Sequence, residues 1–155
     1  MRLAGAEYSI RKKAYDIFIS GCTRNCYNCF NKEVQDFNFG TLIDTETIQS
    51  IITKVSKNVA IVSRLRIMGG DLLCNPDAEA HAFITRIKRD LPKCIALVLY
   101  TGANKEDIPE WCFDLFDEIK YGSYDDALHC DSDLYGSTNQ HYIIKDKQKG
   151  WKEIV

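Results

Sequence analysis

The stretch A-Y-D-I-F-I-S-G-C-T-R-N-C-Y-N-C, residues 14 to 29, joins an apolar segment to a loop with three closely spaced cysteines. Residues 14–19 have the apolar and β-branched composition of a strand. Cys22, Cys26 and Cys29 follow this segment almost at once. The stretch therefore predicts a first strand that leads directly into a thiol-rich loop.

Apolar strand segments alternate with amphipathic helix segments along the rest of the chain. Residues 44–57 predict a helix, because Ile48, Ile51, Ile52 and Val55 recur at helical spacing. Asp44 or Thr45 is the expected cap. Further helices are predicted from Pro76 to just before Pro92 and over 105–116, and further strands over 65–68, 94–100, 118–121 and, as the last, 142–145. This alternation is typical of βαβ units, so we expect an α/β fold with one open, mainly parallel sheet.

Three candidate site segments each come directly after a predicted strand. The cysteine loop follows residues 14–19, Gly69-Gly70 follows residues 65–68, and Thr101-Gly102 follows residues 94–100. Parallel sheets bind their ligands at the carboxyl ends of their strands. We therefore expect these segments to meet at one edge of the sheet, although they are far apart in the sequence.

Length and composition narrow the class of protein. A chain of 155 residues with 45% hydrophobic residues suits one folded domain, residues 1–155. The net charge of −2 shows no basic excess, which disfavours nucleic acid and anionic membrane surfaces as partners. The N-terminus has no apolar run that predicts a signal peptide or a membrane span. We therefore expect a cytoplasmic protein, in which thiols stay reduced.

Three clustered thiols without a fourth beside them point to a metal centre with an incomplete set of protein ligands. Thiolates suit zinc and iron–sulfur clusters, and a closed site of either kind normally takes four ligands. Three thiolates on a four-iron cluster would leave one iron open to another molecule. The alternative is a zinc loop completed by a distant Cys or His. Of the remaining cysteines, Cys74, Cys94 and Cys112 are expected to be buried and Cys130 to lie in a polar loop.

The spacing C-x3-C-x2-C after a first strand resembles the radical S-adenosylmethionine (SAM) enzymes. More narrowly, the chain resembles the activating proteins of anaerobic ribonucleotide reductases. The segments that carry this resemblance are F-I-S-G-C (18–22), C-F-N (29–31), M-G-G-D-L-L (68–73), L-Y-T-G (99–102) and Y-G-S-T-N-Q (135–140). The chain departs from the family pattern at residues 5–11, Asn28, Leu72 and Tyr121.

The resemblance implies a partial (βα) barrel of the radical SAM type and a specific set of site residues. Cys22, Cys26 and Cys29 would bind three irons of a [4Fe–4S] cluster, and SAM would chelate the fourth iron. The resemblance assigns no catalytic side chain, because the cofactors carry the chemistry. The residues expected to bind SAM are Gly69, Gly70 and Asp71 near its ammonium, together with Tyr27, Asn28, Thr101 and Asn139.

The resemblance also implies a protein substrate. The enzyme would cleave SAM reductively and form a glycyl radical on the large subunit of an anaerobic ribonucleoside-triphosphate reductase. Its electron donor would resemble flavodoxin or ferredoxin, and the enzyme would be able to form a homodimer. Independently of the resemblance, the sequence has a mildly basic tail, which is either a solvated face or a contact for an acidic partner or an electron donor: Lys145, Lys147, Lys149 and Lys152. The alternatives are an activator of another glycyl-radical enzyme, of the formate-lyase type, and a non-catalytic zinc or iron–sulfur module.

Overall fold

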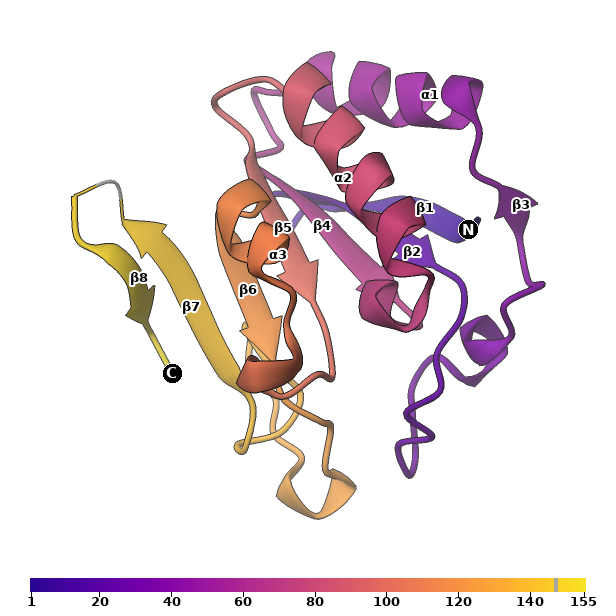
Figure 1. Cartoon of the computed structure of the whole chain (residues 1–155). Helices are drawn as coiled ribbons and strands as arrows, with labels where there is room; N and C mark the ends of the chain where they lie inside the picture. The colour runs from indigo at the N-terminus through magenta and orange to yellow at the C-terminus, as the bar shows by residue number, and fades with distance from the viewer. Residues whose placement is uncertain (147) are drawn as a thin grey trace.

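The computed structural model describes residues 1–146 and 148–155, so Lys147 of the predicted basic tail lies outside the described residues. Eight strands form one sheet in the order β3-β1-β2-β4-β5-β6-β7-β8 (Figure 1). The strands are β1 (Arg2–Ser9), β2 (Ala14–Ile19), β3 (Thr41–Leu42), β4 (Arg64–Gly69), β5 (Ala96–Tyr100), β6 (Glu118–Tyr121), β7 (His141–Asp146) and β8 (Gly150–Glu153).

The sheet is mixed, which corrects the expectation of a mainly parallel sheet. Strands β2, β4, β5 and β6 pair in parallel, whereas β1 and β3 on one side and β7 and β8 on the other pair antiparallel. Residues 14–19 therefore form the second strand and not the first, and residues 142–145 lie in the seventh strand and not the last. Only the parallel centre comes from βαβ units. The α/β architecture, with one open sheet and helices packed on it, is consistent with a partial radical SAM barrel.

The α-helices are α1 (Thr45–Ser56), α2 (Asp77–Asp90) and α3 (Glu110–Leu115). Asp44 is the N-cap of α1, as expected, because its carboxylate accepts a hydrogen bond from the Thr47 backbone N–H at 2.8 Å. The helix predicted over 105–116 is shorter than expected. Pro109 divides it into a 3-10 turn, η3 (Lys105–Asp107), and α3, since a residue that precedes proline avoids the helical conformation.

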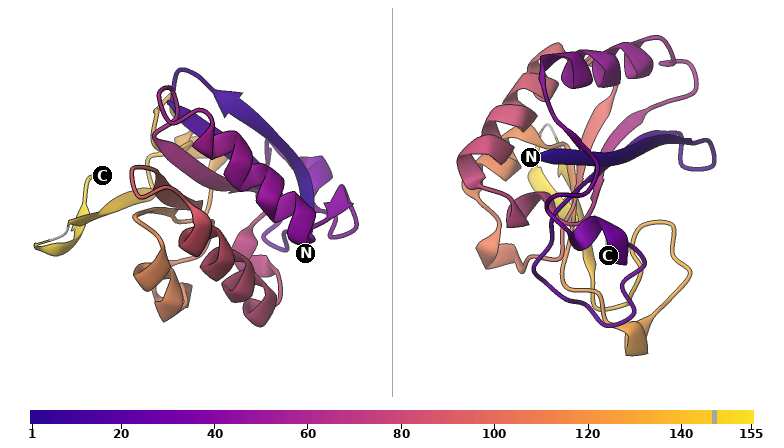
Figure 2. Two further views of the ribbon diagram at one scale, coloured as in Figure 1. Left: turned by 90° about the horizontal axis from the view of Figure 1, so that it is seen from above. Right: turned by 90° about the vertical axis from the view of Figure 1, so that its right-hand side faces the viewer.

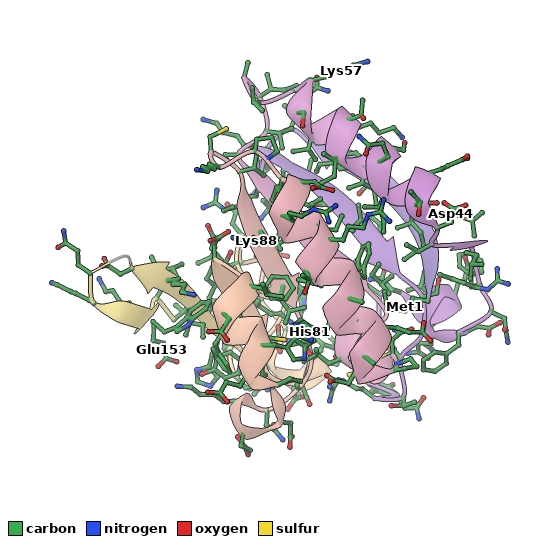
Figure 3. All side chains as sticks on the ribbon, turned by 45° about the horizontal axis from the view of Figure 1, so that its top comes forward. Met1, Asp44, Lys57, His81, Lys88 and Glu153 are labelled. Atoms are coloured by element: carbon green, nitrogen blue, oxygen red, sulfur yellow. The ribbon has the colours of Figure 1, made fainter. Side chains whose placement is uncertain are left out.

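Helices α1, α2 and α3 lie side by side on one face of the sheet (Figures 1 and 2). The predicted stripe of α1 is buried against the strands, with Val55 fully inaccessible. His81 of α2, which is labelled in Figure 3, stacks on Trp111 of α3 with ring centroids 4.9 Å apart, so these two helices are in contact. Among the described residues, no helix combines the length and apolar character that crossing a bilayer requires.

Alternation along the strands gives the sheet two different faces. Ile17, Ile67 and Ile119 contribute to the core under the helices. Their neighbours Asp16 of β2, Arg66 of β4 and Lys120 of β6 therefore project from the opposite face, as does Tyr100 of β5. The buried ion pair between Arg66 and Asp16, with Nη2 and Oδ2 2.5 Å apart, joins β2 to β4 on that face. The fold thus leaves one face of its parallel centre lined with polar and charged groups.

Candidate active site

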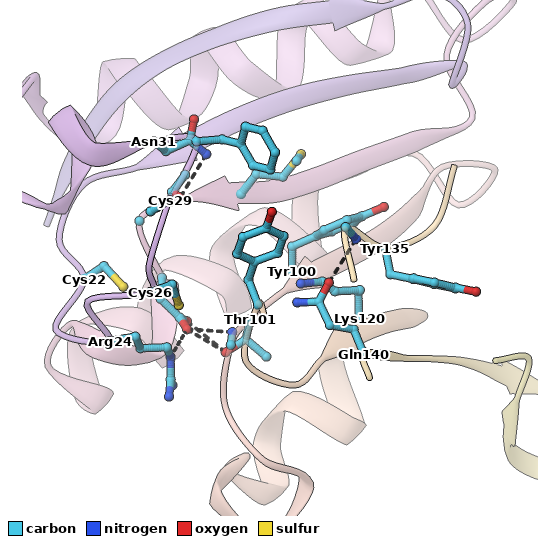
Figure 4. A pocket seen from close by; sticks show the side chains of 18 of the residues that line it. Cys22, Arg24, Cys26, Cys29, Asn31, Tyr100, Thr101, Lys120, Tyr135 and Gln140 are labelled. Atoms are coloured by element: carbon cyan, nitrogen blue, oxygen red, sulfur yellow. Dashed lines mark hydrogen bonds and ion pairs between the residues drawn. The ribbon is translucent and has the colours of Figure 1, made fainter. Parts of the chain in front are cut away.

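A cavity of about 390 Å³ lies on this polar face, where the parallel strands end (Figure 4). The loops after β2, β4, β5 and β6 all contribute to its wall. Of the residues expected from the sequence, the wall includes Cys22, Cys26, Cys29, Gly69, Gly70, Asp71 and Thr101. The predicted convergence of the three segments at one edge of the sheet is therefore confirmed.

The cysteine loop is held to the end of β2 by its own backbone. Gly21 N–H donates to the Val34 carbonyl at 2.8 Å, and Cys22 N–H donates to the Gln35 carbonyl at 3.1 Å. Asn25 and Asn28 both have a φ of +51°, a left-handed conformation that asparagine tolerates better than most side chains. The departure from the family pattern at Asn28 thus has a local reason: few residues other than Gly and Asn suit this turn.

Cys74 lies next to the cysteine loop, although it comes from the segment after β4. Thr23 Oγ1 lies 3.5 Å from Cys74 Sγ. The neighbouring Cys22 thiol lowers the pKa of the Cys74 thiol to about 6, and the Cys74 thiol raises the pKa of Cys22. Cys74 is only half-buried, so the expectation that it is buried is wrong, and its sulfur lies beside the cysteine loop.

The remaining cysteines differ in their surroundings. Cys112 of α3 is fully buried, as expected, and burial raises the pKa of its thiol to about 12. Cys94 is exposed, so the expectation that it is buried is wrong. The reason is that β5 begins only at Ala96, which leaves Cys94 in the turn before the strand. Cys130 is a partly exposed free thiol.

Asp71 organises the cavity wall through its buried carboxylate. The carboxylate accepts hydrogen bonds from Thr101 Oγ1 at 2.9 Å, from Gly102 N–H at 2.9 Å and from Leu73 N–H at 3.0 Å. Arg24, from within the cysteine loop, places its Nε 2.5 Å from Asp71 Oδ2. Asp71 therefore joins the cysteine loop to the ends of β4 and β5.

Gly69 and Gly70 are required where β4 ends against β2. Gly69 has a φ of +109°, and a Cβ at this position would lie 2.6 Å from backbone atoms of Ile19. A Cβ at Gly70 would lie 2.5 Å from the Gly21 carbonyl oxygen. The two glycines therefore allow the start of the cysteine loop to pass directly over the end of β4. The Gly69 carbonyl is approached by Asn31 Nδ2 at 3.4 Å.

Three of the residues expected to bind SAM do not line this cavity. Tyr27 and Asn139 line a neighbouring pocket with Asp125 and Asp126, and Tyr27 is 77% exposed. Asn28 donates a hydrogen bond from Nδ2 to Asp126 at 3.0 Å. These side chains therefore lie beside the cavity and not on its wall.

Several wall residues were not expected as site residues. They are Lys12, Arg24, Arg66, Tyr100 and Lys120, whereas Gln140, which the resemblance places at the active site or facing the partner, does line the wall. Figure 4 shows Arg24 on the cysteine side with Lys120 and Gln140 opposite. Arg24 could have been suspected because it lies between the first two cysteines. Lys120 could have been suspected because it alternates with the apolar Ile119 and so points to the other face of the sheet.

The donor set fits a 4Fe–4S cluster. Three free, partly accessible thiols of one loop face one cavity, and thiolate sulfur is the ligand that iron–sulfur clusters take. Within residues 1–146 and 148–155, no three His, Cys, Asp or Glu side chains gather tightly enough for a single metal ion. The three sulfurs thus share a cavity without forming a single-ion site.

Comparisons with known proteins place the chain in a family. Residues 12–143 match the family model described as a 4Fe-4S single cluster domain. The anaerobic ribonucleoside-triphosphate reductase-activating protein of Haemophilus influenzae is 34% identical over 77 residues, which is 49% of this chain and 50% of that protein. The match thus spans about half the length of that relative. The protein of the same name from Enterobacteria phage T4 is 27% identical over 126 residues, 80% of this chain and 79% of the relative.

No solved structure matches the chain significantly. The family model covers well over half of the 155 residues, including the cysteine loop and the segments after β4 and β5. The chain therefore belongs to the family of 4Fe–4S single cluster domains of the radical SAM type.

Proposed function

We propose that the protein is a radical SAM activase that forms a glycyl radical on an anaerobic ribonucleoside-triphosphate reductase. The observation that carries this proposal is the meeting of the three loop cysteines with Gly69, Gly70 and Asp71 in one cavity. The names of the two relatives support the choice of reductase as the substrate. When bound, the cluster and SAM supply one-electron chemistry that ends with removal of a hydrogen atom from a glycine Cα.

The residues of the chain bind, orient and shield these groups. Cys22, Cys26 and Cys29 would hold three irons of the cluster and leave the fourth iron to SAM. The Arg24–Asp71 pair would fix the loop between the first two cysteines. No side chain is needed as a general acid or base, since placement of the cofactors and exclusion of water are the tasks of the protein.

The proposed SAM-binding set divides into two groups. Gly69, Gly70, Asp71 and Thr101 keep this role because they line the cavity that holds the cysteines. Asp71 is already bonded to Arg24, so a SAM ammonium would share this carboxylate with a guanidinium. For Tyr27, Asn28 and Asn139, which lie outside the cavity, we propose contact with SAM or with the incoming protein segment at its mouth.

A protein substrate suits the surface around the cavity. Tyr27 and Phe30 of the cysteine loop are 77% and 75% exposed, and Phe30 packs against Tyr124 with ring centroids 5.6 Å apart. Exposed aromatic side chains are enriched where proteins recognise each other. The proposal also includes a flavodoxin- or ferredoxin-like electron donor and a homodimer, both of which rest on the resemblance.

The test is electron paramagnetic resonance (EPR) on the protein mixed anaerobically with its reductase, SAM and dithionite. We expect a glycyl doublet on the reductase, and we expect no doublet when the target glycine of the reductase is replaced by alanine. SAM cleavage without a doublet on the reductase would move the assignment to another glycyl-radical enzyme, such as one of the formate-lyase type. A colourless protein that contains zinc and no iron would contradict the proposal and would favour the alternative of a non-catalytic zinc module.

A further inference from the structure

The charged groups on the cavity wall are paired, with one exception. Ion pairs join Arg24 to Asp71, Arg66 to Asp16 and Lys12 to Asp133, each with a nitrogen–oxygen distance of 2.5 Å. Lys120 forms no ion pair and donates no side-chain hydrogen bond to any residue in the described ranges 1–146 and 148–155. The cavity therefore contains one positive charge without a protein counter-charge.

The position of Lys120 directs this charge toward the site. Lys120 lies on β6 opposite Tyr100 of β5, and its carbonyl accepts a hydrogen bond from Thr101 N–H at 2.9 Å. Its ammonium nitrogen lies 5.7 Å from the centre of the Tyr100 ring. Burial lowers the pKa of Lys120 to about 8, and the negative charges of Asp71 and of a Cys26 thiolate act against this shift. Lys120 and Cys26 line the same cavity, so the ammonium faces the space that the loop cysteines also face.

A largely buried ammonium without a partner is unfavourable unless a ligand supplies negative charge. Asp71 does not fill this role alone, because Arg24 already pairs with it. A cluster held by three thiolates brings negative charge to the same cavity, and one-electron reduction makes that charge larger. A nearby cation stabilises the reduced form more than the oxidised form, by Coulomb's law.

We propose that Lys120 is a positioning residue whose ammonium favours the reduced cluster and so raises its reduction potential. The inference rests on the proposed cluster at Cys22, Cys26 and Cys29. In the step concerned, one electron passes from an external one-electron donor, dithionite in the test, to the cluster. Lys120 keeps its proton and forms no covalent bond.

The experiment is an anaerobic redox titration of the reconstituted protein near pH 7, without SAM, followed by EPR of the reduced cluster. Lys120→Met removes the charge and keeps the length of the side chain. We expect the ratio of reduced to oxidised cluster at a fixed potential to fall about tenfold, the order of magnitude of one charge–charge interaction inside a protein. For one electron this is a shift of about 59 mV to lower potential. Lys120→Gln is a second neutral variant and should shift in the same direction.

Two further variants separate charge from structure. Lys120→Arg keeps the positive charge and should restore the potential of the parent protein. Lys93→Met removes an exposed lysine from the turn before β5, at the opposite end of the sheet, and should leave the potential unchanged. Iron and sulfide contents are matched before titration, so that the variants differ only in charge.

Unchanged potentials in both neutral variants would overturn the role of Lys120 while leaving the proposed function intact. If Lys120→Met binds SAM more weakly but keeps the reduction potential of the parent protein, the proposed role is also overturned. The ammonium would then bind the SAM carboxylate and would not stabilise the reduced cluster. A parent protein that holds no cluster after reconstitution would contradict both the inference and the proposed function.

Discussion

Replacing Cys26 by alanine is expected to leave the protein without its iron–sulfur cluster. Three thiolates are already one fewer than such clusters normally take, and two would hold a cubane poorly. Cys26 lines the cavity together with Cys22 and Cys29, so its loss leaves only two of the three loop thiolates on the wall. The measurement is iron and sulfide content, with the visible absorption of the brown protein, after anaerobic reconstitution.

The matched control for this change is Cys94→Ala. Cys94 is exposed in the turn before β5, far from the carboxyl ends of the strands, and its replacement should leave the iron content unchanged. Cys74 is a poor control, because its sulfur lies 3.5 Å from Thr23 Oγ1 in the cysteine loop. Full iron and sulfide in Cys26→Ala would show that the ligands have been assigned wrongly.

Replacing Asp71 by alanine is expected to destabilise the protein by about 3 kcal/mol, the low end of the cost of breaking a buried ion pair, because 25% of the Arg24 side chain is exposed to solvent. The change leaves the Arg24 guanidinium without a partner, together with the hydroxyl of Thr101 and the N–H of Gly102. Because Arg24 lies inside the cysteine loop, the loop should also loosen. We therefore expect faster loss of iron and weaker SAM binding in the same variant. Anaerobic urea unfolding and timed iron release measure these effects.

Asp90→Ala is the matched control for this prediction. Asp90 forms an ion pair with Arg89 on the surface of α2, with Nε and Oδ1 2.7 Å apart, and pairs of this kind contribute little. Its loss should change neither the unfolding midpoint nor the rate of iron release. Equal stability of Asp71→Ala and the parent protein would mean that Asp71 does not anchor the cysteine loop.

The parallel centre of the sheet was predictable because its strands are buried and apolar. Residues 118–121 form β6, as predicted, and α1 has the predicted apolar stripe, with Asp44 as the one of the two expected residues that caps it. The convergence of the cysteine loop with Gly69-Gly70 followed from the rule that parallel strands end at the same edge. These features depend on local apolar patterns, which sequence displays directly.

The edges of the sheet were not predictable in the same way. Strand β1, R-L-A-G-A-E-Y-S, is only partly buried and lacks an apolar run, so its pairing with β2 decides its structure. The same holds for β8, G-W-K-E, which is largely exposed. The ion pairs of the cavity could not be predicted from the sequence either. Arg24 and Asp71, for example, are 47 residues apart, and only the folded chain brings them together.

The most direct test of the account is reductive cleavage of SAM by the reconstituted protein alone. The protein is incubated anaerobically with SAM and dithionite, and methionine and 5′-deoxyadenosine are quantified. The account predicts both products in equal amounts from the parent protein and from Cys94→Ala, and neither from Cys26→Ala. Intact SAM in the presence of a fully loaded and reduced cluster would contradict it.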